Sequence, residues 1–492
     1  MATKYEMVVG LEVHAQLATQ SKLFCACPTD GFGAPPNSRI CPVCTGQPGV
    51  LPVLNRRAAE LAFRAALALG CRITPISIFA RKNYFYPDLP KAYQISQYEL
   101  PFSEHGGLEI RTKDGHTQRV RIHRIHMEED AGKLLHAIGA EKLDCSLVDF
   151  NRGGTPLVEI VSEPDLRSSD EAYAYLTALK EILQYAGVSG CNMEKGEMRC
   201  DANVSLRPEG TEKFGTRAEI KNLNSFHNVK LALEHEFVRQ AEILDSGGRV
   251  VQETRLWDAE RGMTASMRSK EEAHDYRYFP DPDLLPLEAD ADWIGRIQAE
   301  LPELPARRRA RLAAEFGLSD YDAEVLSGDK ELGDYFLAAK PHKKNAKTLS
   351  NLMTTELLAR LNAESLSTAE ARGKIRPEHL SELAGIVAEG KISSKIAKEV
   401  FSRLWDGKIT GLEKDGNILV AIERQGLAQV SDEGRIKAWV QEALAANPKA
   451  AEDLRGGKER AAGSIVGAVM KLSKGKANPA LVNRLIKEAV KS

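Results

Sequence analysis

Four cysteines near the start of the chain are grouped in two pairs. Cys25 and Cys27 form a CxC pair, Cys41 and Cys44 form a CxxC pair, and 13 residues separate the pairs. Four thiolates in this grouping are typical of a closed tetrahedral zinc site, with sulfur ligands about 2.3 Å from the metal. The segment between the pairs is rich in glycine and proline, so a metal would organise a loop with little core of its own. A redox-active CxxC pair is the alternative, and the second pair within reach favours structural zinc.

A second group consists of three consecutive acids, Glu128, Glu129 and Asp130, which precede a Gly-Lys turn. Carboxylates hold hard cations, and Mg²⁺ usually takes one or two of them together with phosphate oxygens of a substrate. Glu12 and His14 are two residues apart, so on a strand they would share one face and could contribute to the same site. The sequence therefore predicts a magnesium site built from separate segments.

Alternating segments indicate the strands that would position these groups. Residues 9–16, 199–207 and 217–221 alternate apolar and polar side chains with period two, the pattern of strands with one buried face. Residues 157–161 place Glu159 inside an apolar run, where an ionised glutamate needs a cation, a basic partner or a proton. We expect an antiparallel sheet whose polar face lines a cleft, with an ordinary solvated sheet face as the alternative. The polar faces carry Glu12, His14, Gln16, Arg199, Asp201, Asn203, Arg217, Glu219 and Lys221.

Residues 81–91 interleave cations with aromatic side chains, Lys82 and Tyr84 among them. That combination suits contacts with phosphates and stacked bases, although a proline-bounded surface loop with inward-facing rings would have the same composition. Residues 275–283 have a similar character. Neither a Walker motif nor a G-x-G-x-x-G fingerprint follows a predicted strand, so any ATP site must be made of side chains on a sheet together with a metal.

The chain changes character near residues 290–305, where Pro302 and Pro305 block a continuous helix. Before this break, amphipathic helices are expected at 170–189 and 225–246, where they would cover the apolar side of the sheet; the first begins near a capping residue at 168–170. After the break, the apolar spacing predicts successive helices at 307–315, 322–326, 348–363, 377–388 and 395–406.

The last part of the chain carries a local excess of positive charge. Residues 447–492 contain ten Lys or Arg against four Asp or Glu, and the cations include Lys458, Lys471 and Lys474. Such a patch can contact the phosphates of a nucleic acid. The usual alternative is a solvated helical face.

Composition limits the class of protein. The 492 residues include 67 Lys or Arg and 69 Asp or Glu, for a net charge of −2, so this is not a uniformly basic nucleic-acid binder. No apolar run approaches the roughly 18 residues that span a bilayer, and no secretory signal is visible, so we expect a cytoplasmic protein without a membrane segment. In that compartment the other four cysteines, at 71, 145, 191 and 200, are expected to be buried thiols rather than disulfides.

Taken together, these segments resemble the B subunit family of the heterotrimeric aspartyl/glutamyl-tRNA(Asn/Gln) amidotransferases. The matching stretches run in order across nearly the whole chain, and several exceed ten residues. They are residues 8–25, 41–55, 81–101, 125–136, 148–165, 198–207, 217–226, 255–284 and the helical tail.

The resemblance implies an α+β fold of three parts. Residues 1–293 would form a catalytic cradle domain with an antiparallel sheet related to that of glutamine synthetase. Residues 294–410 would form an all-α helical domain, and residues 411–492 a small helical tail domain that binds tRNA.

The resemblance also implies the reaction and the partners. The B subunit would bind misacylated Glu-tRNA(Gln) or Asp-tRNA(Asn) and, with ATP and Mg²⁺, phosphorylate the side-chain carboxylate of the Glu or Asp. Ammonia from a glutaminase A subunit would displace the phosphate, giving Gln-tRNA(Gln) or Asn-tRNA(Asn), while a C subunit ties A and B together. The zinc would be structural, and which mischarged tRNA is used depends on which charged tRNAs the cell makes.

The residue types assign roles within that reaction. Mg²⁺ would be held by Glu12, His14, Glu128 and Glu159, with Glu129 and Glu219 as additional acids. Nucleotide or acyl-phosphate would face Arg199, Asn203, Arg217 and Lys221. The tRNA 3′ end would meet Lys82 and Tyr84.

Two other classes of function stay open. A non-catalytic, zinc-containing tRNA-binding scaffold would explain the cysteines and the basic tail, but not the acids on the strand faces. A free-standing ligase acting on a small carboxylic acid would need neither tRNA nor partner subunits. The chain has no obvious glutaminase nucleophile with a positioned base, which favours dependence on a partner for ammonia.

Overall fold

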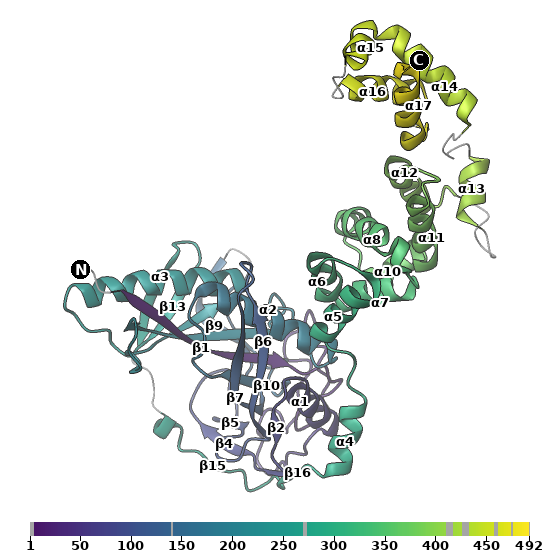
Figure 1. Cartoon of the computed structure of the whole chain (residues 1–492). Coiled ribbons are helices and arrows are strands. Elements are labelled where there is room, and N and C mark those ends of the chain that lie inside the picture. The colour runs from purple at the N-terminus through teal and green to yellow at the C-terminus, as the bar shows by residue number, and fades with distance from the viewer. Residues whose placement is uncertain are drawn as a thin grey trace. The chain divides into compact units, whose positions relative to one another are not determined.

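The computed structural model describes residues 4–138, 141–268, 273–409, 417–425, 432–456, 461–473 and 476–491. It divides the chain into two compact units, Met1–Leu304 and Pro305–Ser492 (Figure 1). The division falls at the predicted proline-rich break, because α4 ends before it and α5 begins with Pro305.

The first unit contains most of the strands and the helices that cover them. In chain order its elements are β1 (Tyr5–Gln16), α1 (Arg56–Ala68), β2 (Arg72–Ile73), β3 (Ile76–Ser77), β4 (Ala80–Asn83), β5 (Tyr93–Ser96), β6 (Ser103–Arg111), β7 (Thr117–Glu129), β8 (Lys133–Ile138), β9 (Glu141–Asp149), β10 (Pro156–Ser162), α2 (Ser169–Tyr185), β11 (Met198–Pro208), β12 (Ala218–Leu223), α3 (Phe226–Asp245), β13 (Thr254–Asp258), β14 (Met263–Arg268), the 3₁₀ turn η1 (Ala273–Tyr276), β15 (Phe279–Pro280), β16 (Leu287–Glu288) and α4 (Ala291–Ala299).

A nine-stranded sheet with the order β14-β13-β12-β11-β1-β10-β7-β6-β2 forms the centre of this unit. Its neighbouring strands are antiparallel except for β12 and β13, which are parallel. The four predicted strands pair in the expected antiparallel way, and only the pair of β12 with β13 departs from it. The reason is the long crossover through α3 between β12 and β13, which brings the chain back in the same direction. A second small sheet, β15-β4-β5, contains Lys82 of the cation-aromatic segment.

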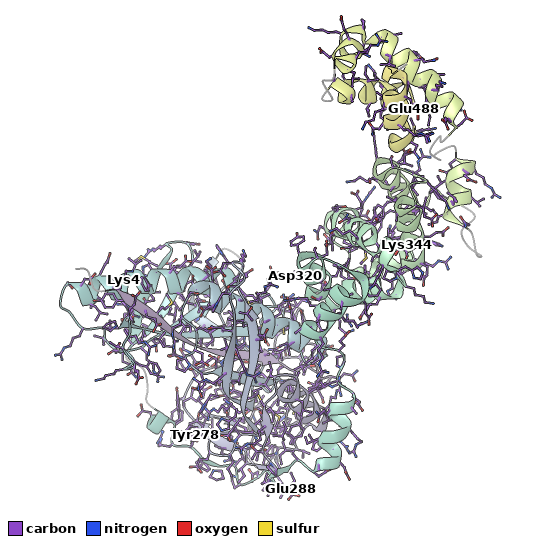
Figure 2. The ribbon with its side chains drawn as sticks, in the orientation of Figure 1. Lys4, Tyr278, Glu288, Asp320, Lys344 and Glu488 are labelled. Carbon is purple, nitrogen blue, oxygen red and sulfur yellow. The ribbon has the colours of Figure 1, made fainter. Side chains whose placement is uncertain are left out.

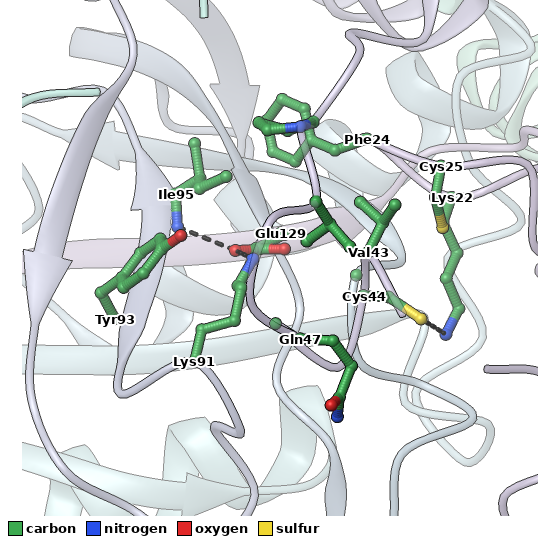
Figure 3. A pocket seen from close by; sticks show the side chains of 14 residues that line it. Lys22, Phe24, Cys25, Val43, Cys44, Gln47, Lys91, Tyr93, Ile95 and Glu129 are labelled. Carbon is green, nitrogen blue, oxygen red and sulfur yellow. Dashed lines mark hydrogen bonds and ion pairs between the residues drawn. The ribbon is translucent and has the colours of Figure 1, made fainter. Parts of the chain in front are cut away.

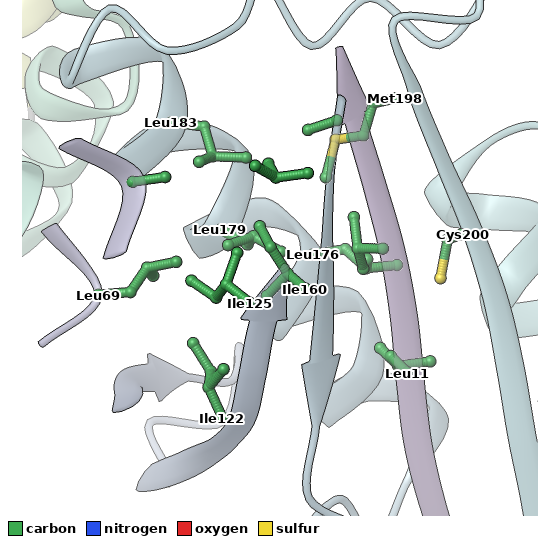
Figure 4. Close-up of a cluster of buried hydrophobic side chains, with 14 of the residues drawn as sticks. Leu11, Leu69, Ile122, Ile125, Ile160, Leu176, Leu179, Leu183, Met198 and Cys200 are labelled. Atoms are coloured by element: carbon green, nitrogen blue, oxygen red, sulfur yellow. The ribbon is translucent and has the colours of Figure 1, made fainter. Parts of the chain in front are cut away.

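The apolar face of the large sheet is covered by helices, as its alternating strands require. Val9, Leu11 and Val13 of β1 are fully buried, and α1, α2 and α3 pack against this side of the unit. Figure 4 shows leucines of α2, at positions 176, 179 and 183, meeting Ile125 and Ile160 of the sheet. Ser168 is the N-cap of α2, and its hydroxyl accepts a hydrogen bond from the Glu171 amide.

The named elements of the second unit are all helical. Its elements are α5 (Pro305–Phe316), α6 (Asp320–Gly328), α7 (Lys330–Ala338), α8 (Lys343–Leu352), the π-helical turn η2 (Met353–Leu357), α9 (Leu358–Glu364), α10 (Thr368–Lys374), α11 (Pro377–Ala388), α12 (Ser394–Trp405), α13 (Ile418–Arg424), α14 (Glu433–Ala446), α15 (Pro448–Arg455), α16 (Ala462–Leu472) and α17 (Pro479–Lys491). Polar side chains such as Asp320 and Lys344 lie at its surface (Figure 2).

Two separate apolar cores stabilise the second unit. One includes Leu326, Leu349 and Leu383 and draws on α5 to α13, and the other, including Ile436 and Val469, draws on α14 to α17. Among the described residues, no helix is long and apolar enough to cross a bilayer.

Candidate active site

Four polar residues form one row across four neighbouring strands. In the register of the sheet, Arg199 of β11 lies opposite His14 of β1, His14 lies opposite Glu159 of β10, and Glu159 lies opposite His126 of β7. Side chains alternate along a strand, so directly paired residues point to the same face. The register therefore gathers residues from positions 14 to 199 on the polar side of the sheet.

His14, Glu128 and Glu159 form a candidate metal site on this face, the metal group. Their donor atoms all lie within 4.8 Å of one another. The Nδ1 atom of His14 is 3.2 Å from Glu128 Oε1 and 4.0 Å from Glu159 Oε2. One imidazole nitrogen and two carboxylates in a largely buried setting fit a divalent cation.

The electrostatics of the metal group favour the charged forms. Burial lowers the pKa of His14, but its contact with Glu128 and the charge of Glu159 outweigh that effect and raise the pKa to about 9. Burial raises the pKa of Glu159, but His126 and His14 outweigh it and hold that pKa at about 2. The pKa of Glu128 lies well below its usual range because contacts with His126 and His14 overcome its burial. Both carboxylates are therefore ionised near neutral pH.

His126 is a residue that the sequence interpretation did not assign to the site. It is 3% exposed, and its Nε2 atom lies 3.3 Å from Glu159 Oε2 and 3.8 Å from Glu128 Oε2. Its position two residues before Glu128 on one strand is the signal that would have placed it on the same face.

Lys82 lies beside the metal group among aromatic rings. Its ammonium is 4.8 Å from the centre of the Tyr276 ring and 5.8 Å from that of Tyr84. Burial lowers the pKa of Lys82, but the charges of Glu128 and Glu159 raise it above its ordinary value overall. Lys82 thus interacts with Glu128 and Glu159 as well as with the rings. The sequence prediction gave it only a tRNA contact.

Tyr276 and Tyr278 come from the second cation-aromatic segment. The Tyr278 ring is stacked on Tyr98 with ring centres 4.2 Å apart, and Tyr276 meets Tyr84 edge to face at 6.0 Å. Two segments almost 200 residues apart in the sequence therefore build one aromatic wall, and Tyr278 is labelled in Figure 2.

The three consecutive acids have three different surroundings. Glu128 belongs to the metal group, and its Oε2 accepts a hydrogen bond from Ser96 Oγ at 3.3 Å. Glu129 is paired with Lys91 and accepts a hydrogen bond from the Ile95 amide at 2.9 Å, so the structure does not bring it into the metal group. Asp130 is paired with Arg199.

The other predicted magnesium ligands lie farther along the polar face. Glu12 accepts a hydrogen bond from Asn203 Nδ2 at 2.9 Å. Glu219 accepts one from Thr254 at 2.8 Å and lies 3.4 Å from the ammonium of Lys221. Neither belongs to the close set of three donors in the metal group.

Of the predicted nucleotide-facing residues, only Arg199 lines the wide groove beside the metal group. This groove has a volume of about 710 Å³. The ammonium of Lys221 pairs with Asp201 at 2.6 Å. Burial lowers the pKa of Lys221, but the charges of Asp201 and Glu219 outweigh burial and raise it. Arg217 is exposed and directly precedes β12. The charged and amide residues lining the groove are Gln16, Lys133, Asp149, Asn151, Arg152, Glu194, Lys195, Glu197, Arg199, Asp201, Asn222 and Asn224.

The four paired cysteines come together in the loops that follow β1. Their sulfur atoms all lie within 4.8 Å of one another, which fits a tetrahedral site whose edges are about 3.8 Å for zinc-sulfur bonds near 2.3 Å. Lys22, fully buried, donates a hydrogen bond to Cys44 Sγ at 3.6 Å, as Figure 3 shows. The hydrogen bond from Cys25 and the charge of Lys22 lower the pKa of Cys44 to about 4.

The single cysteines divide by environment. Cys71, Cys191 and Cys200 are buried, as expected. Cys145 is exposed, so the expectation that it packs in a core is wrong: β8 and β9 form a separate two-stranded sheet, in which residues 144–147 of β9 are exposed.

The predicted tRNA cations of the tail are only partly placed. Lys471 is exposed in the last turn of α16. Lys458 and Lys474 lie outside the described residues.

Comparison with known proteins identifies both parts of the chain. The family model of the GatB/GatE catalytic domain matches residues 7–295, and that of the GatB domain matches residues 334–490. The B subunit of the aspartyl/glutamyl-tRNA(Asn/Gln) amidotransferase from Brevibacillus brevis is 53% identical over 491 residues, 100% of each chain. The protein of the same name in Syntrophotalea carbinolica is 54% identical over 488 residues, 99% of each chain, and that of Geobacter sulfurreducens 53% over 487 residues, again 99% of each.

These matches extend through the strands that carry the metal group, the cysteine loops and the helical unit alike. The chain belongs to the family of aspartyl/glutamyl-tRNA(Asn/Gln) amidotransferase B subunits.

Proposed function

We propose that this chain acts in a complex that converts misacylated Glu-tRNA(Gln), Asp-tRNA(Asn) or both into Gln-tRNA(Gln) and Asn-tRNA(Asn). Its part is to transfer the γ-phosphoryl group of ATP to the side-chain carboxylate of the tRNA-bound Glu or Asp. Ammonia from a glutaminase A subunit then attacks the acyl carbon, and inorganic phosphate leaves. A small C subunit holds A and B together. Support comes from full-length relatives that carry this amidotransferase name.

The chemistry requires this order because a free carboxylate is a poor acyl donor. Phosphoryl transfer is catalysed mainly by positioning and by neutralising charge on the phosphate oxygens. Mg²⁺, when bound, supplies part of that neutralisation.

One observation carries the proposal: a group of carboxylates and histidine lies one strand away from an arginine that lines a large groove. His14, Glu128 and Glu159 would hold Mg²⁺, and Arg199 would face the phosphates of ATP. Lys82, whose ammonium lies over the Tyr276 ring and interacts with the charges of Glu128 and Glu159, would meet the acceptor end of the tRNA and the charge that develops on the acyl group.

The remaining assignments extend the same proposal. Glu12 and Glu219 would support the metal group, and Asn203, Arg217 and Lys221 would support nucleotide binding, from positions along or beside the polar face. Glu129, which pairs with Lys91 outside the metal group, is not assigned to it. The large sheet would be related to that of glutamine synthetase, with the first unit as the catalytic cradle. The second unit would divide near residue 410 into a helical domain and a tRNA-binding tail domain. The cysteine group would hold structural zinc.

The test uses the purified heterotrimer with mischarged tRNA and labelled ATP. Glu128→Gln should abolish ATP-dependent acyl-phosphate formation while leaving glutamine hydrolysis by the A subunit intact, and Glu129→Gln serves as the neighbouring comparison. If Glu128→Gln turns over like the wild type at saturating Mg²⁺, the assignment of the metal group is wrong. Transamidation assays with each mischarged tRNA identify the substrate.

A further inference from the structure

The carboxylate of Asp130 holds three side chains at the edge of the groove. Asp130 is 4% exposed. It accepts two hydrogen bonds from Arg199, at 2.9 and 3.0 Å, and one from Gln16 Nε2 at 2.8 Å, while Arg152 Nε lies 3.7 Å away. The two parallel bonds to Arg199 are the fork geometry that fixes the orientation of a guanidinium as well as its position.

Arg199 occupies a position where other acids compete for it. It lies directly across from His14, whose other neighbour in the sheet is Glu159, and Glu128 is two residues before Asp130 on the chain. Without Asp130, the Arg199 guanidinium, whose side chain is 35% exposed, would be attracted to other nearby carboxylates. The charge of Glu128 already acts on Arg199, and Glu128 must stay available for a divalent cation.

We propose that Asp130 is a positioning residue that holds Arg199 at the groove and away from the carboxylates of Glu128 and Glu159. This inference rests on the proposed function, since it assumes a divalent cation at the metal group and an ATP phosphate beside Arg199. Asp130 thereby keeps two neighbouring binding sites separate. Glu128 binds the divalent cation, and Arg199 binds the phosphates of ATP.

Arg152 is held mainly by the backbone and only weakly by Asp130. Its guanidinium donates hydrogen bonds to the backbone oxygens of Ala131 at 3.0 Å and Gly132 at 2.6 Å. Loss of the Asp130 charge therefore frees Arg199 and leaves Arg152 in place. This difference makes Arg199 the partner to vary in the test.

The experiment measures Mn²⁺ affinity of the heterotrimer, by electron paramagnetic resonance with Mg²⁺ competition, together with KM for ATP and kcat. Asp130→Asn should weaken Mn²⁺ binding about tenfold and raise KM for ATP by a similar factor, the size usual for loss of a residue that orients a ligand-binding group. KM should change more than kcat. Adding Arg199→Gln to Asp130→Asn should restore Mn²⁺ affinity, because the released arginine is gone, but not KM.

The matched control is Asp165→Asn. Asp165 makes the same two-bond pair with Arg121, at 2.6 and 2.9 Å, outside the groove, and its loss should leave Mn²⁺ affinity and KM for ATP unchanged. Unchanged Mn²⁺ affinity in Asp130→Asn, or no recovery in the double variant, overturns the inference. Should Asp130→Asn fail to fold, Arg199→Gln alone decides: it must raise KM for ATP with unchanged Mn²⁺ affinity, and weaker Mn²⁺ binding refutes the role.

Failure of the proposed function has a different signature. Glu128→Gln must weaken Mn²⁺ binding if the metal group is correct. If Glu128→Gln binds Mn²⁺ like the wild type, the assignments of the metal site and of Asp130 are both wrong. If Glu128→Gln loses Mn²⁺ affinity but Asp130→Asn binds Mn²⁺ like the wild type, only the assignment of Asp130 is wrong.

Discussion

At the scale of single residues, side-chain alternation decides which of three neighbouring acids can act together. Glu128 reaches the metal group and Asp130 reaches Arg199, whereas Glu129 between them is paired with Lys91. Sequence proximity grouped all three in one site. The period of two along a strand separates the middle acid from its neighbours, and that argument was available from the sequence once the strand was recognised.

His126 should contribute to stability because it contacts both carboxylates of the metal group. His126→Ala should lower the free energy of unfolding by about 1–3 kcal/mol, the usual cost of leaving buried polar partners unsatisfied. His123 is the matched control, since it lies on the same strand and pairs with Glu163 at 3.0 Å but is half exposed. Urea denaturation of His126→Ala and His123→Ala, without divalent cations, measures the free energy of unfolding of each. Equal decreases would show that the contacts of His126 do not stabilise the fold.

The cysteine group should determine zinc content. We expect one zinc per chain in the wild type purified without chelator, and Cys44→Ser, which removes one thiolate ligand, should lower the zinc content well below that level. Cys145→Ser should keep that level, because Cys145 is exposed and outside the group. Metal analysis by mass spectrometry checks both. A wild-type protein without stoichiometric zinc would contradict the assignment.

At the scale of elements, a buried acid joins α3 to the edge of the large sheet. Glu236 is fully buried; it contacts Arg255 of β13 at 3.0 Å and Arg239 of its own helix at 2.8 Å, and it accepts a hydrogen bond from Thr264 of β14 at 2.5 Å. Burial raises its pKa, but these contacts outweigh burial and lower it below the ordinary value of 4.5. The helix-sheet contact therefore depends on an ionised carboxylate.

Glu236 should make stability depend on acid pH. Because its pKa is lowered in the folded state, its contribution is complete above about pH 4.5 and is lost as pH falls through the lower folded-state pKa. Glu236→Gln should therefore reduce the free energy of unfolding at pH 7 and narrow its difference from the wild type towards pH 3. Glu242→Gln, an exposed site on α3, should follow the wild type at every pH. Denaturation series at several pH values check this, and a pH-independent difference would contradict it.

Helix prediction from the sequence succeeded where apolar spacing and caps agreed. The prediction of 377–388 coincides with α11, and 225–246 differs from α3 by one residue at each end. The helix predicted at 348–363 is divided, because a π-helical turn at Met353–Leu357 joins α8 to α9. The prediction omits α1, although Asn55 caps it and its alanine-rich sequence favours a helix.

At the scale of the whole molecule, the candidate metal ligands and the basic tail belong to different units. The metal group lies within Met1–Leu304, and the basic tail residues lie within Pro305–Ser492. The apolar core of α14 to α17 is separate from that of α5 to α13. We expect the last core to be removable without loss of the first unit's structure.

Removal of the chain after residue 431 should weaken tRNA binding and reduce its salt dependence. Eliminating one phosphate contact reduces the slope of log K against log salt by about 0.7 to 0.9. Replacing Lys449, Lys471 and Lys487 together by Gln tests the charge without removing the core. Filter binding between roughly 50 and 200 mM salt, the range in which such contacts matter, measures both. An unchanged affinity and slope would exclude the tail as a tRNA contact.

The sequence by itself determined which side chains are candidate metal ligands, which residues share a face of a strand, and that the second half is helical. These features depend on residue identity and local periodicity. Its motifs also carried the family resemblance that the comparisons confirm. Only the tertiary structure decided which polar residues meet. Register across β11, β1, β10 and β7 brings Arg199, His14, Glu159 and His126 into one row, and pairing between distant strands is set by the packing of the whole sheet rather than by any one segment.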